Sequence, residues 1–348
     1  MTLLVTGATG FAMSVLARHW LETDHTARLV VLDAAPLDAA AERYFAPFMK
    51  RLAVIVADVT QPETWRAALA GHRITHIVHG ATITPISRGT VAEVKREPEA
   101  ETPARIIDVN VMGTVAMLEW ARTLTNLERL IYVSSGGVYK HHGPDRPGEP
   151  LPEDGYVMPR RLYGISKLAS ELITERYGDL FGLPTASVRP SSVYGPMDRV
   201  TVSRNFRHVP NRIAHMAVDG VKCVRVNTLD AVGDYIYVED VAAAIVSLLR
   251  APQLHYSVYN IAGGVTASMR DIVAWAAEKV PGFRAEIVPA EEADIVQDPT
   301  LRDGMWGAYD VSRIKAETGW KPRPMREALH AYMDWIVSER NSSTRRPA

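Results

Sequence analysis

Two side chains suited to proton transfer lie four residues apart in a segment whose pattern predicts a helix. Tyr163 and Lys167 stand at the two ends of the motif YGISK, and this spacing places both on one helix face. A tyrosine titrates near pH ~10 in water, so its use as a base near neutrality requires its anion to be stabilised by ~4 kcal/mol. The ammonium of Lys167 can supply much of that stabilisation. Because the same spacing occurs by chance on many surface helices, the pair needs support from other residues.

A strand that ends in two hydroxyl groups supplies a third candidate. The segment LIYVSS, residues 130–135, has the pattern of a buried strand whose carboxyl end carries Ser134 and Ser135. Open α/β sheets bind ligands at this edge. Ser135 can therefore exchange a hydrogen bond with the oxygen of a carbon that is being oxidised. The alternative is that a serine here, Ser134 in particular, caps the turn before Gly136.

A glycine-containing turn near the N-terminus predicts a phosphate-binding site. The first strand runs into TGATGFA, residues 6–12, and a helical pattern follows. Glycines permit a tight turn, so that backbone N–H groups can approach a pyrophosphate at a helix N-terminus. A G-x-x-G is also consistent with an ordinary turn. Met13 stands where a third small residue is expected, which predicts a displaced helix more than lost binding. The residues expected to bind the cofactor here are Gly7, Gly10, Phe11 and Ala12.

Carboxylates that follow the next two strands favour NAD as the cofactor. Asp33 ends the second predicted strand, where a carboxylate can accept both hydroxyls of an adenosine ribose. No arginine follows it to bind a 2′-phosphate, so the pattern favours NAD over NADP. Asp58 and Val59 follow the third strand and are expected to flank the adenine. A helix-capping role for Asp58 is the alternative.

Alternating strands and helices predict an α/β fold of the Rossmann type, a doubly wound parallel sheet with a smaller C-terminal substrate-binding lobe. Thr60 and Glu63 predict a capping box at the start of the helix after the third strand, and Ser268 with Asp271 predicts another cap. The buried strands are predicted at residues 3–6, 28–32, 52–57, 74–79, 130–134 and 185–188. Residues 83–103 and 140–160 are expected to be loops over a site.

The elements after Arg189 are less regular and suggest how the chain divides. Helices are expected at 211–218 and 238–249, and strands near Tyr235 and at 256–261. The predicted NAD-binding domain is 1–189, with 234–262 returning to it; the lobe is 190–233 with 263–340, and 341–348 is a frayed tail.

Bulk composition indicates a small-molecule partner. Of the 348 residues 23% are charged and the formal net charge is -1, so no overall field favours nucleic acid or an anionic membrane. The single cysteine, Cys223, excludes an internal disulfide and a multi-thiolate metal site. His141–His142 and the pair His208 and His215 lack supporting ligands, so no metal is expected. The N-terminus has no cleavage signal or long apolar run, and we expect a cytoplasmic location.

Ordered motifs along nearly the whole chain resemble the extended short-chain dehydrogenase/reductase superfamily, the group of NAD-dependent sugar epimerases, dehydratases and dehydrogenases. These motifs are TGATGF, HIVHGAT, DVNVMGT, VSSGGVY, YGISK, RPSSVYGP, DYIYVEDVA, YNIAGG and ETGWKP. The resemblance implies that Ser135, Tyr163 and Lys167 form the catalytic set. Asn110 would lie behind Lys167, where it either orders a water or makes a routine buried hydrogen bond. Further cofactor contacts are implied at Gly80, Ala81, Thr82, Asn110, Tyr163, Lys167 and Pro190. We expect substrate contacts at Ser135, Gly136, Tyr163 and Ser192.

Departures from the family pattern narrow the expected substrate. Family dehydratases carry an Asp–Glu pair after the catalytic Ser or Thr, and Gly136–Gly137 stand there instead, which disfavours dehydration. An arginine that grips a nucleotide diphosphate is replaced by Gly233, and the asparagine before VYGP is replaced by Ser192. A smaller polyol, sugar or sugar acid is therefore favoured. Basic residues that could replace the missing charge, or form a solvated face, are Arg199, Arg204, Arg207 and Arg212.

The expected activity is NAD-dependent hydride transfer at a secondary hydroxyl, as in a dehydrogenase. A (nucleotide-)sugar epimerase uses the same residues and is the first alternative. A non-catalytic NAD-binding sensor or scaffold is the second, although an intact Ser, Tyr and Lys set argues against it. We expect a homodimer built from the helices around Asn110 and Tyr163, with Met112, Val115 and Leu118 as contacts. Those three side chains could equally face the protein's own sheet.

Overall fold

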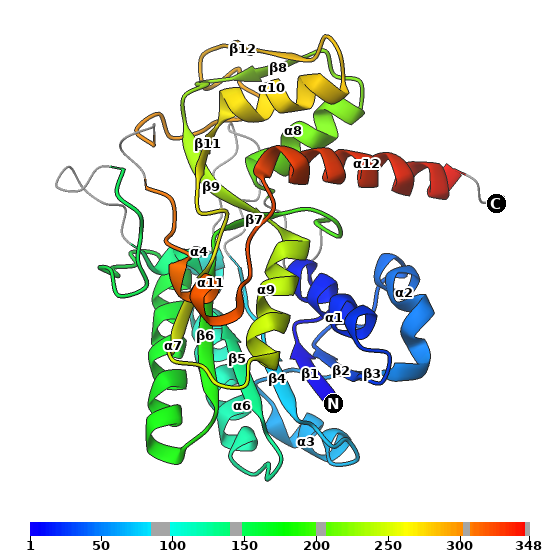
Figure 1. Cartoon of the computed structure of the whole chain (residues 1–348), viewed down its shortest axis with the longest axis vertical. Coiled ribbons are helices and arrows are strands. Elements are labelled where there is room, and N and C mark those ends of the chain that lie inside the picture. The colour runs from blue at the N-terminus through cyan, green and yellow to red at the C-terminus, as the bar shows by residue number, and fades with distance from the viewer. Residues whose placement is uncertain (85–97, 140–147, 200–206, 302–306, 345–348) are drawn as a thin grey trace.

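The six predicted N-terminal strands lie in one parallel sheet, which confirms the α/β fold (Figure 1). The structure, a computed structural model, describes residues 1–84, 98–139, 148–199, 207–301 and 307–344. One further strand joins the sheet from the C-terminal half. In spatial order the strands are β3 (Leu52–Val56), β2 (Arg28–Asp33), β1 (Thr2–Thr6), β4 (His76–His79), β5 (Arg129–Val133), β6 (Thr185–Pro190) and β10 (Val258–Ile261).

The strand order reverses beside β1. Strands β2 and β3 lie on one side of it, and β4, β5 and β6 lie on the other. The carboxyl ends are level, because Thr6 pairs with Leu32 on β2 and with His79 on β4. In an open α/β sheet such a switch point leaves a crevice at the carboxyl ends of the strands, where ligands bind.

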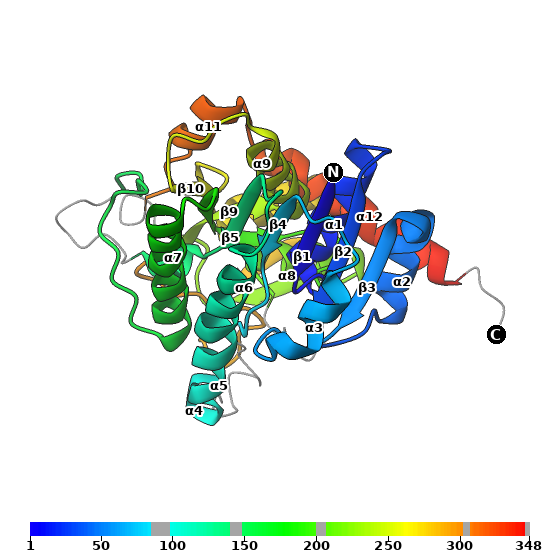
Figure 2. The same cartoon turned by 90° about the horizontal axis from the view of Figure 1, so that it is seen from below.

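Helices cover both faces of the sheet (Figure 2). Leu3 and Val5 of β1 join the core beneath α1 and α9, whereas Leu4 joins the core beneath α3 and α6. This alternation follows from the period of two residues in a strand. On the first face lie α1 (Phe11–Thr23) and α9 (Val238–Arg250), and on the second lie α3 (Pro62–Leu69), α6 (Gly113–Ala121) and α7 (Leu162–Phe181). Shorter elements between them are α2 (Ala39–Phe45), α4 (Pro98–Glu101), α5 (Pro103–Ile107), a 3-10 turn (Ala46–Arg51) and a π-helical turn (Asp108–Met112).

A second hydrophobic core forms the smaller lobe at the top of Figure 1. It is centred on aromatic residues such as Tyr194, Tyr237 and Tyr332. Its helices are α8 (Val209–Val218), α10 (Met269–Lys279) and α12 (Met325–Thr344). Its strands are β7 (Ser192–Tyr194), β9 (Val232–Tyr237) and β11 (Thr266–Ser268) in one sheet and β8 (Cys223–Val226) with β12 (Arg284–Ile287) in another, while α11 (Ser312–Thr318) packs near α9 and β10.

One of the two predicted helix caps is confirmed and the other is wrong. Ser268 and Asp271 form a reciprocal capping box at the start of α10, as predicted. Helix α3 is present, but its N-cap is Gln61 and no side chain caps it. The hydroxyl of Thr60 donates instead to Asp58 Oδ1 at 2.7 Å. Because the helix begins at Pro62 with Gln61 as its N-cap, Thr60 lies one residue before the capping position.

The predicted loops and tail contain more helix than expected. Of residues 83–103, the described part includes the short helix α4 and the first residue of α5, and residues 85–97 lie outside the described residues. Residues 140–147 of the second predicted loop also lie outside them. Residues 341–344 continue α12 and 345–348 lie outside the described residues, so the frayed tail stays a prediction.

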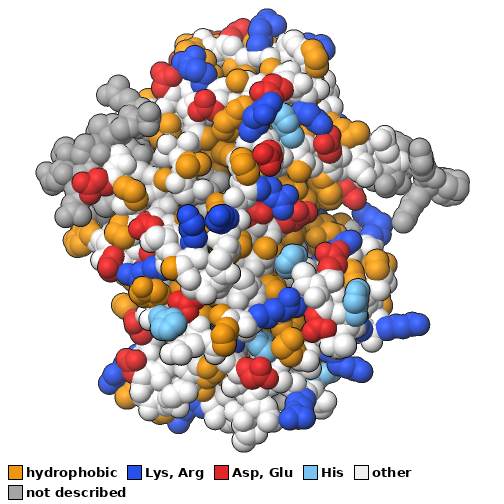
Figure 3. Space-filling view, in the orientation of Figure 1, with side chains coloured by type: hydrophobic (Ala, Val, Ile, Leu, Met, Phe, Trp, Pro, Cys, Tyr) orange, Lys and Arg blue, Asp and Glu red, His pale blue; other side chains and the backbone are white. Residues whose placement is uncertain are grey.

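The charge distribution on the face in Figure 3 is mixed. Basic and acidic side chains are interspersed there and neither sign dominates, in keeping with the net charge of -1. Within the described ranges, no helix is long and apolar enough to cross a membrane.

Candidate active site

A cavity of about 1340 Å³ lies at the switch point, along the carboxyl ends of the sheet strands. Its walls come from the turn after β1, the segments after β2 to β6, the start of α7 and the segment around Tyr309. It therefore connects the glycine turn with the candidate proton-transfer residues. The predicted site residues on its wall are Gly7, Gly10, Phe11, Ala12, Asp33, Asp58, Val59, Gly80, Ala81, Thr82, Ser135, Gly136, Tyr163, Lys167, Pro190 and Ser192.

The glycine turn has a backbone conformation that requires glycine at position 7. Gly7 has a φ of 74°, and a Cβ there would lie 2.9 Å from the backbone nitrogen of Ala81. Its N–H donates to Leu32 O at 3.0 Å, and its carbonyl accepts from Gly10 N at 3.1 Å. Gly10 is the N-cap of α1, so the N-terminus of this helix opens onto the cavity. The helix dipole favours negative charge at that end, which suits a pyrophosphate.

Met13 is accommodated by a second glycine. Its side chain is 6% exposed, and its Sδ lies only 2.5 Å from the position that a Cβ on Gly80 would occupy. A larger residue at position 80 would collide with the thioether. The unusual Met13 and the glycine at the end of β4 are therefore a matched pair, and the turn keeps its shape.

The two carboxylates after β2 and β3 differ in how they are engaged. Asp33 is half-buried and accepts from Thr9 N at 3.0 Å and from Ala35 N at 3.1 Å. Each of its oxygens retains a further lone pair for a ribose hydroxyl. Asp58 accepts from the backbone and the hydroxyl of Thr60 and forms an ion pair with Arg105. Arg105 also lines the cavity and was not anticipated, because it follows directly on a segment that we predicted to be a loop.

Replacing Asp33 by asparagine should weaken NAD binding by about 10-fold, because a charged acceptor becomes a neutral amide. The affinity for NADP should rise relative to that for NAD, since the carboxylate no longer repels a 2′-phosphate. Fluorescence titration of each dinucleotide measures both effects. Asp179→Asn, on the exposed side of α7, serves as the matched control. Equal NAD affinities for Asp33→Asn and wild type would show that Asp33 does not contact the ribose.

The structure brings the candidate proton-transfer residues together. Lys167 is 2% exposed, donates to Val133 O at 2.8 Å and has its Nζ 5.8 Å from the centre of the Tyr163 ring. Burial lowers the pKa of Lys167 to about 7. The Tyr163 ring lies beside Gly137, with Cε1 3.7 Å from the position of a Cβ there. Ammonium, phenol and the strand end of β5 therefore meet at one end of the cavity.

Ser135, and not Ser134, caps the turn that follows β5. Its Oγ accepts from Gly137 N at 3.0 Å at the start of a 3-10 turn (Gly136–Val138). Capping and a substrate contact are compatible, because the hydroxyl proton of Ser135 is still available for donation. The hydroxyl of Ser134 is buried and has no hydrogen-bond partner among the described residues.

Asn110 is not among the residues that line the cavity, and its assignment to the cofactor-binding set stays a prediction. It is 1% exposed, in the π-helical turn before α6. Its amide nitrogen donates to Ser166 Oγ at 2.9 Å, and its amide oxygen accepts from Ile83 N at 2.8 Å. Since Ser166 precedes Lys167, Asn110 fixes the start of α7 to the segment after β4. This is the routine buried hydrogen bonding that the sequence left open.

A buried chain of polar groups links the glycine turn to Asn110. Thr6 Oγ1 accepts from Gly80 N and Ala81 N and lies 2.8 Å from His79 Nδ1. His79 Nε2 lies 3.2 Å from the hydroxyl of Thr114, which donates to Asn110 O. Burial, with a contribution from Lys167, lowers the pKa of His79 to about 3. A neutral imidazole therefore connects the glycine turn to Thr114 and, through it, to Asn110. The sequence motif HIVHGAT contained this histidine, but its spacing gave no sign of the role.

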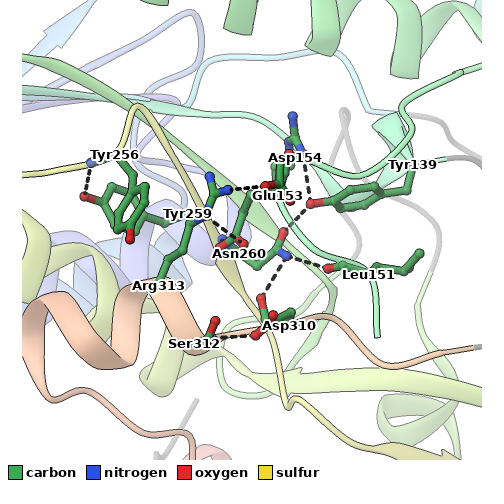
Figure 4. Close-up of polar contacts among 11 residues, drawn as sticks. Tyr139, Leu151, Glu153, Asp154, Tyr256, Tyr259, Asn260, Asp310, Ser312 and Arg313 are labelled. Carbon is green, nitrogen blue, oxygen red and sulfur yellow. Dashed lines mark hydrogen bonds and ion pairs between the residues drawn. The ribbon is translucent and has the colours of Figure 1, made fainter. Parts of the chain in front are cut away.

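A second network, drawn in Figure 4, supports the other end of the cavity. Asn260 on β10 accepts from Tyr139 Oη at 2.7 Å and donates to Leu151 O and Asp310 O, each at 2.9 Å. Its backbone N–H donates to Glu153 at 2.9 Å. Segments far apart in the sequence thus converge on one amide. Tyr139, a cavity-lining residue, is held in place by it.

The three described arginines of the predicted basic set are not among the residues that line the cavity wall. Arg204 lies outside the described residues, and Arg199, Arg207 and Arg212 do not line the wall. Arg199 instead forms an ion pair with Asp38 at 2.8 Å, and Arg212 donates to a backbone carbonyl. Their suggested role in replacing the missing charge stays a prediction. The arginine side chains that do line the cavity in the described part of the chain are those of Arg105, Arg160 and Arg161.

The histidines do not form a metal site in the described part of the chain. No group of three or more His, Cys, Asp or Glu side chains there could hold a metal ion. His208 lines the cavity at the N-terminus of α8, and His215 lies 3.2 Å from Tyr332 Oη. His141–His142 lie outside the described residues.

Comparison with known proteins identifies the family. Residues 3–262 match the NAD dependent epimerase/dehydratase family. The chain belongs to this family. A dTDP-glucose 4,6-dehydratase of Shigella flexneri is 26% identical over 98% of this chain and 94% of its own length. A UDP-glucose 4-epimerase of Mycolicibacterium smegmatis is 27% identical over 93% and 94%. The UDP-glucose 4-epimerase of Thermus thermophilus, solved in complex with NAD, superposes with a TM-score of 0.74 at 25% identity, covering 96% of this chain and 98% of that one.

The cavity fits the cofactor of the NAD dependent epimerase/dehydratase family. The glycine turn and the N-terminus of α1 open onto the cavity, where backbone N–H groups suit phosphates, and the carboxylate of Asp33 lines the same cavity at the end of β2. Thr82 Oγ1 is buried and has no hydrogen-bond partner among the described residues, although Thr82 lines the cavity. A buried polar atom of this kind is expected where a ligand completes the hydrogen bonding. The enzyme is therefore NAD-dependent, with Ser135, Tyr163 and Lys167 at the opposite end from Asp33.

Proposed function

We propose that this enzyme oxidises a secondary hydroxyl of a sugar, polyol or sugar-acid-like substrate, as a dehydrogenase. The observation that carries the proposal is that Ser135, Tyr163 and Lys167 share one wall of the cavity that begins at the glycine turn. Bound NAD supplies the hydride acceptor. A (nucleotide-)sugar epimerase, in which the oxidised carbon is reduced again from the other side, is the second candidate.

The side chains divide the proton chemistry among them. Ser135 Oγ accepts from Gly137 N, so its own proton points elsewhere and can be donated to the substrate oxygen. Tyr163, as phenolate, then removes the substrate hydroxyl proton. Lys167 is buried beside the phenol, and an ammonium in a low-dielectric site strongly favours a neighbouring anion. The oxygen left on the substrate becomes a carbonyl.

Substrate size is inferred from two glycine positions. A Cβ on Gly233 would lie 2.8 Å from the Tyr235 ring, so an arginine cannot be placed there without moving that ring. A Cβ on Gly136 would overlap Tyr309, which leaves no room for an acidic side chain of the kind that dehydratases use. The observation at Gly233 favours a substrate smaller than a nucleotide sugar. The observation at Gly136 disfavours dehydration. The relatives named for dTDP-glucose and UDP-glucose support the nucleotide-sugar alternative.

Turnover tests the proposal. Purified protein with NAD is given glucose, glucuronate, a hexitol, UDP-glucose and UDP-glucuronate, and reduced nicotinamide is followed by absorbance. We expect net reduced cofactor with at least one free sugar, polyol or acid. Stereochemical change without net reduction would favour the epimerase. Dinucleotide binding with neither result would favour a non-catalytic NAD-binding sensor and overturn the proposal.

A homodimer through the helices around Asn110 and Tyr163 is part of the proposal. Met112 is 52% exposed, and Ile165 and Leu172 on α7 are 43% and 55% exposed, which supports an apolar contact face. Leu118 is wrong as a contact, because it is 1% exposed within the protein's own core. Val115 is half-buried. We also propose a cytoplasmic location, which the single cysteine supports.

A further inference from the structure

The phenol of Tyr309 fills the space beside the catalytic serine. A Cβ on Gly136 would lie 2.5 Å from Tyr309 Cε2, so glycine at position 136 and tyrosine at position 309 are mutually dependent. Both residues line the cavity, together with Ser135. We propose that Tyr309 contacts the substrate and sets substrate selectivity at this end of the cavity. The inference rests on the proposed function, because it concerns the same site.

Tyr309 is held rigidly by the loops around it. Its backbone N–H donates to Asp234 at 3.0 Å. The same carboxylate accepts from Gly263 N at 2.7 Å, from Gly264 N at 3.0 Å and from Ser191 Oγ at 3.1 Å. A buried carboxylate with four donors fixes the segments that bear them. Asp234 therefore ties the Tyr309 segment to the loops that follow β6 and β10.

The Tyr309 ring is fixed by a second contact. It packs edge-on against Tyr139, with the ring centres 5.3 Å apart. Tyr139 in turn donates to Asn260 and accepts from the buried Arg189 at 2.8 Å. Tyr309 itself is 7% exposed. Because ring and backbone are both anchored, the phenol is a preorganised wall and not a mobile side chain.

The chemistry of a phenol decides what this wall recognises. Ser135 and Tyr309 both line the cavity, and Tyr309 lies against Gly136, the residue that follows Ser135, so a substrate whose reacting oxygen contacts Ser135 brings its neighbouring substituent against Tyr309. The hydroxyl can donate to or accept from that substituent. The ring excludes a bulkier group. A site built to hydrogen-bond a substituent rejects analogues that lack it. Tyr309 thus selects compact, hydroxylated substrates.

Ligand affinity tests this role without requiring turnover. The NAD-loaded wild type, Tyr309→Phe and Tyr309→Ala are titrated by calorimetry with glucose, glucuronate, a hexitol, UDP-glucose and UDP-glucuronate. We expect Tyr309→Phe to bind the best ligand about 10-fold more weakly, since one hydrogen bond is lost. Tyr309→Ala should no longer bind this ligand more tightly than the others, and its affinity for the bulkier ligands should rise. NAD affinity should stay at the wild-type value in both.

Two further variants keep the test decisive. Tyr256→Phe alters a half-exposed tyrosine off the cavity wall and should leave the ligand profile unchanged. Gly136→Ala should displace the phenol of Tyr309 and change the ligand affinities in the same direction as Tyr309→Ala does. Because both substitutions act on the same space, the double variant Gly136→Ala/Tyr309→Ala should change these affinities no further. Identical ligand profiles for wild type and the Tyr309 variants, including no binding by any of them, would overturn the proposal. If no substrate is turned over but the Tyr309 variants bind the ligands differently from wild type, the result would contradict the proposed dehydrogenase activity and still support the role of Tyr309.

Discussion

Replacing Tyr163 by phenylalanine should lower kcat/KM by about 10²- to 10⁴-fold, the usual contribution of a positioned proton-transfer group. The ring would still pack beside Gly137 and fill the same part of the cavity wall, so the fold and the affinity for NAD should be retained. Steady-state kinetics and a fluorescence titration of NAD measure the two properties separately.

The expected split distinguishes chemistry from structure. A loss confined to kcat, with NAD affinity unchanged, shows that the phenol acts on the reacting substrate. Tyr256→Phe, which removes a hydroxyl away from the cavity, should turn over like the wild type. If Tyr163→Phe turned over at the wild-type rate, the assignment of the base would be wrong.

Replacing Lys167 by methionine should abolish turnover and at the same time stabilise the ligand-free protein. Burial lowers the pKa of Lys167 to about 7, whereas a lysine in the unfolded chain titrates near ~10.4. Below pH 7 both states carry the ammonium, and the folded state bears the full desolvation cost. Methionine fills a similar volume without that cost. The gain in the free energy of unfolding should be on the order of a few kcal/mol at low and neutral pH.

The stabilisation that Lys167→Met brings should depend on pH. As pH rises from about 7 toward ~10.4, the unfolded state binds more protons than the folded state, so the wild type becomes more stable through this group. The difference in the free energy of unfolding between Lys167→Met and wild type should therefore become smaller as the pH rises. Urea unfolding of both proteins at several pH values measures it. A variant that is less stable than wild type at neutral pH would show that the buried ammonium is better compensated than the structure indicates.

Local sequence patterns were sufficient for the sheet and for the ends of its strands. Short apolar runs that alternate with helical segments, such as that in β1, are typical of strands buried between two layers of helices. A parallel sheet places Asp33 and Ser135 at one edge. The spacing of Tyr163 and Lys167 then fixed their common face on α7. These inferences succeeded because each depends on contacts within one element or on the general geometry of parallel sheets.

The features that sequence reasoning missed depend on contacts between distant segments. Tyr309 reaches Gly136 only because Asp234 gathers the loops after β6 and β10 around it. The hydrogen bonds of the Asn110 amide to Ser166 and to the backbone after β4 join three separate elements. Helix α3 begins later than its capping pattern predicted, with Gln61 and not Thr60 as the N-cap. Sequence periodicity cannot predict these contacts, because each depends on which polar partner the fold brings closest.

The most direct test of the central claim follows the hydrogen on the reacting carbon. The enzyme is incubated with NAD and the active member of the substrate panel, deuterated at its secondary carbinol carbon, and the nicotinamide cofactor is recovered for mass spectrometry. If Ser135, Tyr163 and Lys167 oxidise that carbon at one end of an NAD-filled cavity, the recovered cofactor carries deuterium with the wild type and none with Tyr163→Phe. Unlabelled cofactor from the wild type would contradict the account.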